Sequence, residues 1–115
     1  MKIKTSELTG AALDWAVAVC QNIECDDENR PIWFGDGETR IDYTPTTNWA
    51  QGGPIIEREG LGVVPSADDA SVWVASIFEP DWKFNRTGPT PLIAAMRCYV
   101  ASKLGDEVEI PEGLQ

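Results

Sequence analysis

Two segments near opposite ends of the chain carry apolar side chains at helical spacing, and they constrain the fold most. The first predicts a helix over about 9–22, with Thr9 as its N-cap. The second predicts a helix over about 91–104, because Thr90 is a suitable N-cap and Pro91 takes the first position, where its missing N–H costs nothing. The apolar stripe predicted for the first helix consists of Leu8, Ala12, Trp15, Ala16, Val19 and Ile23.

Each predicted helix also carries a strip of small side chains. The strips consist of Ala12, Ala16 and Cys20 on the first helix and Ala94, Cys98 and Ser102 on the second. Small side chains let two backbones approach closely, so we expect these helices to pack on each other or on a partner subunit. The same strips favour a homodimer.

The segments between the helices predict strands. Residues 32–34 and 39–41 have strand character, and the Gly-Asp-Gly-Glu of 35–38 supplies residues that tolerate positive φ, as a tight hairpin needs. Residues 71–78 alternate between apolar and polar positions and predict a third strand. The expected fold class is therefore α+β, with two helices packed on a small antiparallel sheet.

The rest of the chain reads as less regular. The Pro, Thr, Asn and Gly content of 42–54 argues against a long regular element, and 55–59 predicts a single helical turn. A loop is expected over 81–90. The 115 residues suit one compact domain, which we expect to cover 1–110, with 111–115 as a short C-terminal tail.

The charge balance narrows the range of partners. The net charge is −10, which disfavours direct binding to a nucleic-acid backbone, since that requires a basic face. The charge either keeps the protein soluble or lets an acidic surface imitate DNA. No apolar run is long enough to span a membrane, and the N-terminus lacks the apolar stretch of a secretion signal. We therefore expect a cytosolic protein whose three cysteines are reduced thiols.

The sequence offers little for catalysis. It contains no histidine, so neither a Ser-His-Asp nor a Cys-His site can be built within the chain. The acids of 26–28 lack the spacing of a calcium loop, and the cysteines lack the spacing of a zinc site. The glycine loops at 35–37 and 51–54 match neither a dinucleotide fingerprint nor a P-loop. We expect no catalytic residue, no metal and no cofactor, and thus a protein that is not an enzyme.

Three blocks of the sequence resemble a known family. They are KIKTSELTGAALDWAVA at 2–18, YTPTTNWAQGGPIIERE at 43–59 and GPTPLIAAMRCYVASKLGDEVEIP at 88–111. Together they cover roughly half of the chain and resemble the NinX proteins of lambdoid phages such as P22. The resemblance implies a phage accessory protein in the cytoplasm of an infected bacterial host, and it implies no reaction.

The central segment is the strongest candidate for a functional site, because it holds more kinds of polar group than a connector needs. With one arginine of the second helix, the candidate ligand-binding residues are Tyr43, Thr46, Asn48, Trp49, Gln51, Gly52, Gly53, Arg58 and Arg97. Buried polar groups without partners each cost roughly 1–3 kcal/mol. These groups therefore either satisfy one another in a rigid loop without a cavity, or line a concavity in which an aromatic ring and an arginine face a ligand.

Two functions suit these observations. The first is a non-catalytic phage protein that binds and sequesters a small polar or nucleotide-like molecule, such as a nucleotide-derived signal of host defence. The alternative is an acidic protein-interaction module that inhibits or adapts a host enzyme. An enzyme of unrecognised type is a third, less favoured, reading.

Overall fold

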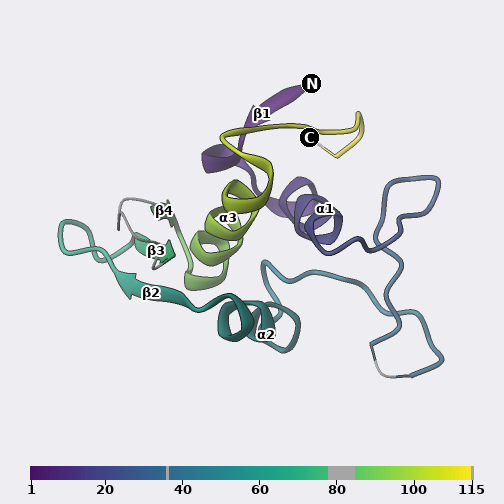
Figure 1. Ribbon diagram of the computed structural model, residues 1–115, viewed down its shortest axis with the longest axis horizontal. Coiled ribbons are helices and arrows are strands. Elements are labelled where there is room, and N and C mark those ends of the chain that lie inside the picture. Colours follow the sequence, from purple (N-terminus) through teal and green to yellow (C-terminus); the bar gives the residue numbers. More distant parts are fainter. Residues whose placement is uncertain (36, 78–84, 115) are drawn as a thin grey trace.

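The helix Pro91–Leu104 (α3) lies at the centre of the protein, with the other elements arranged around it (Figure 1). The structure, a computed structural model, describes residues 1–35, 37–77 and 85–114. The other elements, in chain order, are β1 (Lys2–Lys4), the 3-10 helix η1 (Thr5–Glu7), α1 (Gly10–Cys20), α2 (Trp49–Glu59), β2 (Leu61–Pro65), β3 (Trp73–Ile77), β4 (Asn85–Gly88) and β5 (Glu107–Glu109). Helices together with antiparallel strands confirm the predicted α+β class.

Helix α3 forms where the sequence predicts it, and its ends show why. The Thr90 hydroxyl oxygen accepts a hydrogen bond from the Ile93 N–H at 3.1 Å, and Pro91 takes the first helical position. At the other end Gly105 has a φ of 89°, which glycine adopts without strain. Side chains such as Met96 are fully buried, and α3 is covered on most of its surface rather than along one stripe.

Helix α1 is confirmed, and it ends before the predicted boundary at residue 22. Asn22 has a φ of 59°, so the chain has left the helix there. The predicted stripe is only partly right, because Trp15, Val19 and Ile23 are half-buried. Fully buried residues outside that stripe are Leu13, Val17 and Ala18. Helix α1 is buried over more of its circumference than one stripe, because α3 and the segments next to it cover a wide part of its surface.

The two helices pack against each other, in line with the first of the two arrangements that their small residues predict. Ala16 of α1 and Ala94 of α3 are each fully buried. The homodimer stays a prediction.

The main sheet consists of β2, β3 and β4 in that order, all antiparallel. The predicted strand 71–78 is confirmed over Trp73–Ile77, and residue 78 lies outside the described residues. Residues 85–88, expected within the loop 81–90, form β4 instead, and residues 81–84 lie outside the described part of the chain. The polar sequence of β4 gives no apolar alternation, and its strand conformation comes from pairing with β3.

The predicted strands 32–34 and 39–41 were wrong as members of the sheet. The chain does reverse here, but among the described residues the two segments are joined by an isolated antiparallel bridge, between Trp33 and Ile41, rather than by a ladder. Trp33 is half-buried and packs against the core, whereas Phe34 and Ile41 are 47% and 45% exposed. A two-stranded hairpin with so little of its surface in the core is marginal, and the described residues form no ladder here.

Helix α2 occupies a segment predicted to be irregular, and that prediction was wrong. The Asn48 side-chain oxygen accepts a hydrogen bond from the Ala50 N–H at 2.9 Å and caps the helix, and Gly60 ends it with a φ of 68°. Proline lies inside the helix at position 54, where it removes one backbone hydrogen bond. Packing compensates for this loss, because Ile55 is only 1% exposed.

Strands β1 and β5 pair antiparallel near the two ends of the chain, with Ile3 opposite Val108 (Figure 1). The Ile110 N–H donates to the Met1 carbonyl at 3.0 Å, and Ile110 is 1% exposed. Among the described helices, none is both long enough and apolar enough to cross a bilayer.

Candidate functional site

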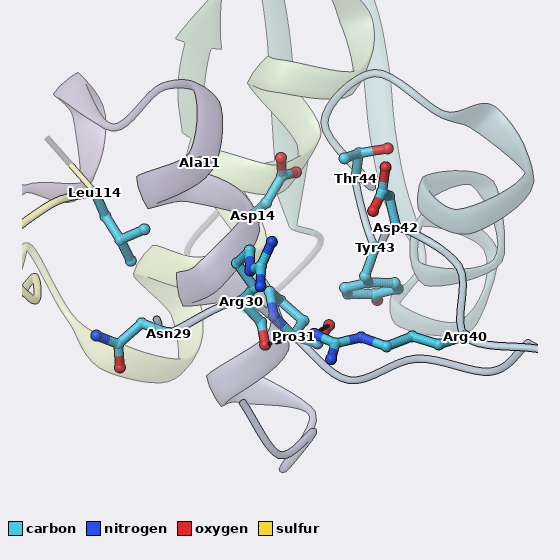
Figure 2. Close-up of a pocket in the computed structure, with 10 residues that line it drawn as sticks. All are labelled: Ala11, Asp14, Asn29, Arg30, Pro31, Arg40, Asp42, Tyr43, Thr44 and Leu114. Atoms are coloured by element: carbon cyan, nitrogen blue, oxygen red, sulfur yellow. Dashed lines mark hydrogen bonds between the residues drawn. The ribbon is translucent and has the colours of Figure 1, made fainter. Parts of the chain in front are cut away.

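A charged hollow of about 450 Å³ lies between α1 and the loop that leads from α1 to α2 (Figure 2). We call it the arginine hollow. It is lined by Ala11, Asp14, Asn29, Arg30, Pro31, Arg40, Asp42, Tyr43, Thr44 and Leu114. Its volume falls in the range of small-molecule sites, and it combines an aromatic ring, carboxylates and guanidinium groups.

Asp26 holds together the two arginines of this hollow. Its Oδ2 accepts from Arg30 Nε at 3.2 Å and from Arg40 Nη2 at 2.8 Å. Its Oδ1 accepts from the backbone N–H groups of Glu28 and Arg30, both at 2.9 Å. The backbone hydrogen bond from Arg30, followed by the side-chain bond from Arg40, lowers the pKa of Asp26 to about 2. Asp26 therefore stays ionised at neutral pH and fixes two guanidinium groups side by side.

Tyr43 supplies the aromatic part of the hollow. It is 4% exposed, and its ring centroid lies 4.9 Å from that of Trp33, with the two planes tilted by 40°. Its hydroxyl oxygen accepts a hydrogen bond from Gln21 Nε2. Burial raises the pKa of Tyr43, so the phenol remains protonated.

Asp14 projects from α1 and adds a buried carboxyl group. Its Oδ1 accepts from the backbone N–H of Thr46 at 3.1 Å and from the Thr46 hydroxyl at 2.8 Å. Burial raises the pKa of Asp14, and the hydrogen bonds from Thr46 oppose that rise. Asp14 and Asp42 are acceptors in a hollow whose arginines are donors, so the hollow can bind a ligand that has both an anionic group and N–H or O–H donors.

Several residues predicted for the site hydrogen-bond to their own surroundings. Gln51 Oε1 accepts from the Thr44 N–H at 2.6 Å, and Gln51 Nε2 donates to the Asp42 carbonyl at 2.7 Å. Asn48 caps α2, and Thr46 bonds to the carboxylate of α1. In the described part of the chain no buried side-chain nitrogen or oxygen lacks a partner. These residues therefore form a closed hydrogen-bond network, which is the first of the two arrangements expected from the sequence.

The two predicted glycines have different surroundings. A Cβ built at Gly52 would lie 2.4 Å from the Pro45 carbonyl oxygen, so Gly52 permits close packing of α2 on the preceding loop. At Gly53 the nearest atom would be a Trp49 ring carbon at 4.0 Å. Trp49 itself is 56% exposed and lies in a different, apolar groove that also contains Trp73.

The two predicted arginines lie outside the hollow. Arg58 pairs with Glu59 at 3.1 Å and donates to Gln21 Oε1 at 3.5 Å, so the same glutamine bonds to both Arg58 and the Tyr43 hydroxyl. Arg97 donates to the Leu8 carbonyl and the Thr87 carbonyl, each at 2.9 Å, and ties the N-terminal segment to β4. Burial lowers the pKa of Arg97.

Tyr43 is thus the predicted site residue that lines the arginine hollow. Sequence reasoning missed Asp14, Asn29, Arg30, Arg40 and Asp42. The usable signal was the predicted reversal around 35–38, because folding 32–34 back toward 39–41 brings the arginines on either side of the turn together.

No group of three or more histidine, cysteine, aspartate or glutamate side chains is gathered as a metal ion would require within residues 1–35, 37–77 and 85–114. The thiols of Cys20 and Cys98 are also unsuited to act as nucleophiles at neutral pH. Burial raises the pKa of each to about 11, which keeps both protonated.

These features define a small α+β protein with a hollow that mixes guanidinium and carboxylate groups. The model of the family described as NinX of bacteriophage P22 matches residues 4–103, and the chain belongs to this family. Its fold is similar to that in the crystal structure of a phage protein from Bacillus cereus ATCC 14579, with a TM-score of 0.51 and 13% sequence identity over 93% of each chain. Among curated proteins no similar sequence is found. The predicted family resemblance is confirmed, and the B. cereus likeness is one of fold alone.

Proposed function

We propose that this phage protein binds a small nucleotide-like anion in the arginine hollow and sequesters it without chemical change. The observation that carries the proposal is the pairing of Arg30 and Arg40 through the one carboxylate of Asp26. This pairing holds two flexible side chains in place before a ligand arrives. A ligand that meets prearranged donors loses less free energy to ordering them, which favours affinity.

The donors that remain are suited to a phosphate. Arg40 Nη2 bonds to Asp26 and also lies 3.4 Å and 3.3 Å from the Arg30 and Pro31 carbonyls, and no hydrogen bond is recorded in the described structure for its Nε or Nη1. Arg30 Nε bonds to Asp26, and its Nη2 lies 3.5 Å from Glu28. Guanidinium N–H groups bind phosphate oxygens well because of their planar, forked geometry.

The local charge restricts the ligand further. Asp14, Asp26 and Asp42 place three carboxyl groups against the guanidinium groups of two arginines, so the hollow has no net positive charge, and an anion would bind through the guanidinium N–H groups that Asp26 leaves open. A nucleotide with a single phosphodiester charge suits this balance better than a triphosphate does. The Asp14 and Asp42 carboxylates would accept hydrogen bonds from ribose hydroxyl or base amino groups.

Two features support a non-catalytic role. The chain has no histidine, which removes the commonest general base. Cys20 is half-buried and Cys98 is buried, and both thiols are protonated at neutral pH. Sequestration needs only affinity, and we place this activity in the cytoplasm of the infected bacterial host, as the phage family suggests.

The proposal can be tested by isothermal titration with cyclic AMP as a singly charged probe and ATP as a highly charged one. We expect cyclic AMP to bind more tightly than ATP. Arg40→Gln should weaken cyclic AMP binding about tenfold or more, since hydrogen bonds to charged groups contribute roughly 1.5–3 kcal/mol. Arg86→Gln is the matched control, because Arg86 pairs with Asp106 outside the hollow, and it should bind within about twofold of the parent.

Mass spectrometry of the released nucleotide should return it unchanged. Conversion to a product would refute the non-catalytic part of the proposal. Equal affinity of the Arg40→Gln and Arg86→Gln variants would refute the assignment of the arginine hollow, and so would binding of neither nucleotide to the parent protein.

A further inference from the structure

Strand β2 is an outer strand of the three-stranded sheet (Figure 1). Its register with β3 shows which of its backbone groups point away from the sheet. The Ser66 N–H donates to the Val72 carbonyl at 2.8 Å, directly beyond the paired positions Pro65 and Trp73. In an antiparallel pair, hydrogen-bonded and non-hydrogen-bonded positions alternate. The even-numbered residues of β2 therefore bond to β3, and the odd-numbered residues turn their backbone groups away from it.

The outward groups form what we call the β2 edge: the N–H and carbonyl of Leu61 and of Val63, and the carbonyl of Pro65. Across the described ranges of the chain, no other element hydrogen-bonds to these groups. A row of unpaired backbone groups on an outer strand is a template for another extended chain. The edge is short and ends at a proline, which lacks an N–H, so it can accept only a short segment.

An apolar groove of about 470 Å³ opens beside this edge. This tryptophan groove is lined by Trp49, Ile56, Leu61, Val63, Trp73 and Pro91, none of which is charged. Trp49 is 56% exposed, a large fraction for an indole. Exposed tryptophans next to apolar hollows are frequent anchors of protein interfaces.

Carboxylate side chains flank β2 on both sides in the sequence. Glu57 precedes the strand, Asp68 and Asp69 follow it, and all three are exposed. A partner that lies along β2 would meet negative charge at each end. A second copy of this chain is a poor occupant, because it carries the same carboxylates and a net charge of −10.

We infer that the β2 edge and the tryptophan groove together bind an extended segment of another protein, with apolar side chains at its centre and lysine or arginine at its ends. The backbone of the segment pairs with Leu61 and Val63 as an added strand. One of its apolar side chains enters the tryptophan groove, and its basic ends face the carboxylates that flank β2. Strand addition takes its affinity from backbone hydrogen bonds and its selectivity from side-chain pockets.

The test uses a short peptide in which valine and threonine alternate between paired lysines. Two further peptides carry N-methyl groups on alternate residues, one on the odd positions and one on the even positions. Only one of these sets can face β2, so one methylated peptide should bind at least about threefold more weakly than the parent and the other should bind like it. Saturation with the parent peptide should slow hydrogen exchange of the Leu61 and Val63 amides.

Protein variants test the groove independently of the backbone. Trp49→Ala should weaken peptide binding about tenfold or more, because exposed tryptophans at interfaces often dominate affinity. Phe34→Ala is the matched control, since Phe34 is also a largely exposed aromatic residue and lies outside the groove, and it should not change binding.

The inference would be overturned by no binding of the parent peptide, by equal binding of both methylated peptides, or by unchanged exchange at Leu61 and Val63 with peptide bound. Protection of the same two amides by self-association of the chain would also overturn it, because the occupant would then be a second copy. None of these results bears on cyclic AMP binding, so this inference and the proposed function fail separately.

Discussion

Gly52 lies where α2 touches the loop before it, and the structure leaves no room there for a methyl group. A Cβ at this position would lie 2.4 Å from the Pro45 carbonyl oxygen and 2.6 Å from Leu92 Cδ2. The leucine methyl group can rotate away, whereas the carbonyl oxygen can move only with the backbone. At the adjacent Gly53 the nearest atom would be Trp49 Cε3 at 4.0 Å, an ordinary van der Waals contact.

The two glycines therefore form a matched pair for substitution. Replacing glycine by alanine inside a helix raises the free energy of unfolding by roughly 0.5–1 kcal/mol, because alanine loses less backbone entropy on folding. Overpacking a close contact lowers it by roughly 1–3 kcal/mol. We expect Gly53→Ala to gain about 0.5–1 kcal/mol, and Gly52→Ala to lose about 0.5–2 kcal/mol once the helical gain is subtracted from the overpacking cost.

Urea denaturation followed by tryptophan fluorescence measures both free energies, and equal m-values show that they are comparable. If both variants are more stable than the parent by the same amount, α2 does not pack on Pro45 as described. If both are less stable, residues 52 and 53 are not in a helix, since only the first has a steric reason to lose stability.

Three further predictions concern the packing of two alanines and the ionisation of one carboxyl group and two thiols. Ala16→Leu and Ala94→Leu should each lower the free energy of unfolding by about 1–3 kcal/mol, and unchanged thermal unfolding would show that these side chains face solvent. The Asp26 carboxyl carbon should titrate in an NMR experiment with a midpoint of about 2, below the ordinary pKa of 3.8. The contribution of this carboxylate to stability is therefore complete above pH 4 and is lost as the pH falls toward 2. A midpoint near 4 would contradict the arginine pairing. Cys20 and Cys98, with pKa values of about 11, should react with Ellman's reagent at neutral pH far more slowly than in the urea-unfolded chain, and equal rates would contradict their burial.

The helices at the ends of the chain could be predicted because their signals are local. Thr90, Pro91 and Gly105 mark the start and end of α3 through backbone geometry that depends on neighbouring residues alone. The extent of burial could not be predicted in the same way. Leu13 and Val17 fall outside the apolar stripe, and they are buried because elements distant in sequence cover α1 on more than one side.

For helix α2, in contrast, local propensity predicted an irregular segment where the structure has a helix. Two glycines and a proline within one segment each disfavour a helix. The helix forms nevertheless. Asn48 caps its start, Gly60 ends it, and Gly52 lets it pack closely on the preceding loop. An asparagine cap is a local signal, which the prediction of an irregular segment did not use, whereas the contact of Gly52 with Pro45 depends on the tertiary fold.

The arginine hollow was predictable only in part, for a related reason. Tyr43 was identified as a site residue from the polar richness of its segment, and it does line the hollow. Asp26 brings Arg30 and Arg40 together, although the two arginines lie at different distances from it along the sequence. The first forms a local bond four residues away, and the second forms a bond across the chain reversal, fourteen residues away. Isolated arginines carry no periodic signal, so only the geometry of the reversal could pair them.

Helix α2 lies between the two surfaces to which we assign ligands, and this position decides whether the surfaces influence each other. On one side Gln51 bonds to the backbone of the segment that contains Tyr43, through the Thr44 N–H and the Asp42 carbonyl. On another side Trp49 lines the apolar groove beside β2. Binding at one surface changes affinity at the other only if the two ligands favour different positions of α2. The helix is capped at its first turn, both ends of the Gln51 amide are hydrogen-bonded, and Gly52 is in close contact with the preceding loop, so a second position would break several of these contacts at once. The structure therefore favours independent binding at the two surfaces, with α2 as a rigid support for both.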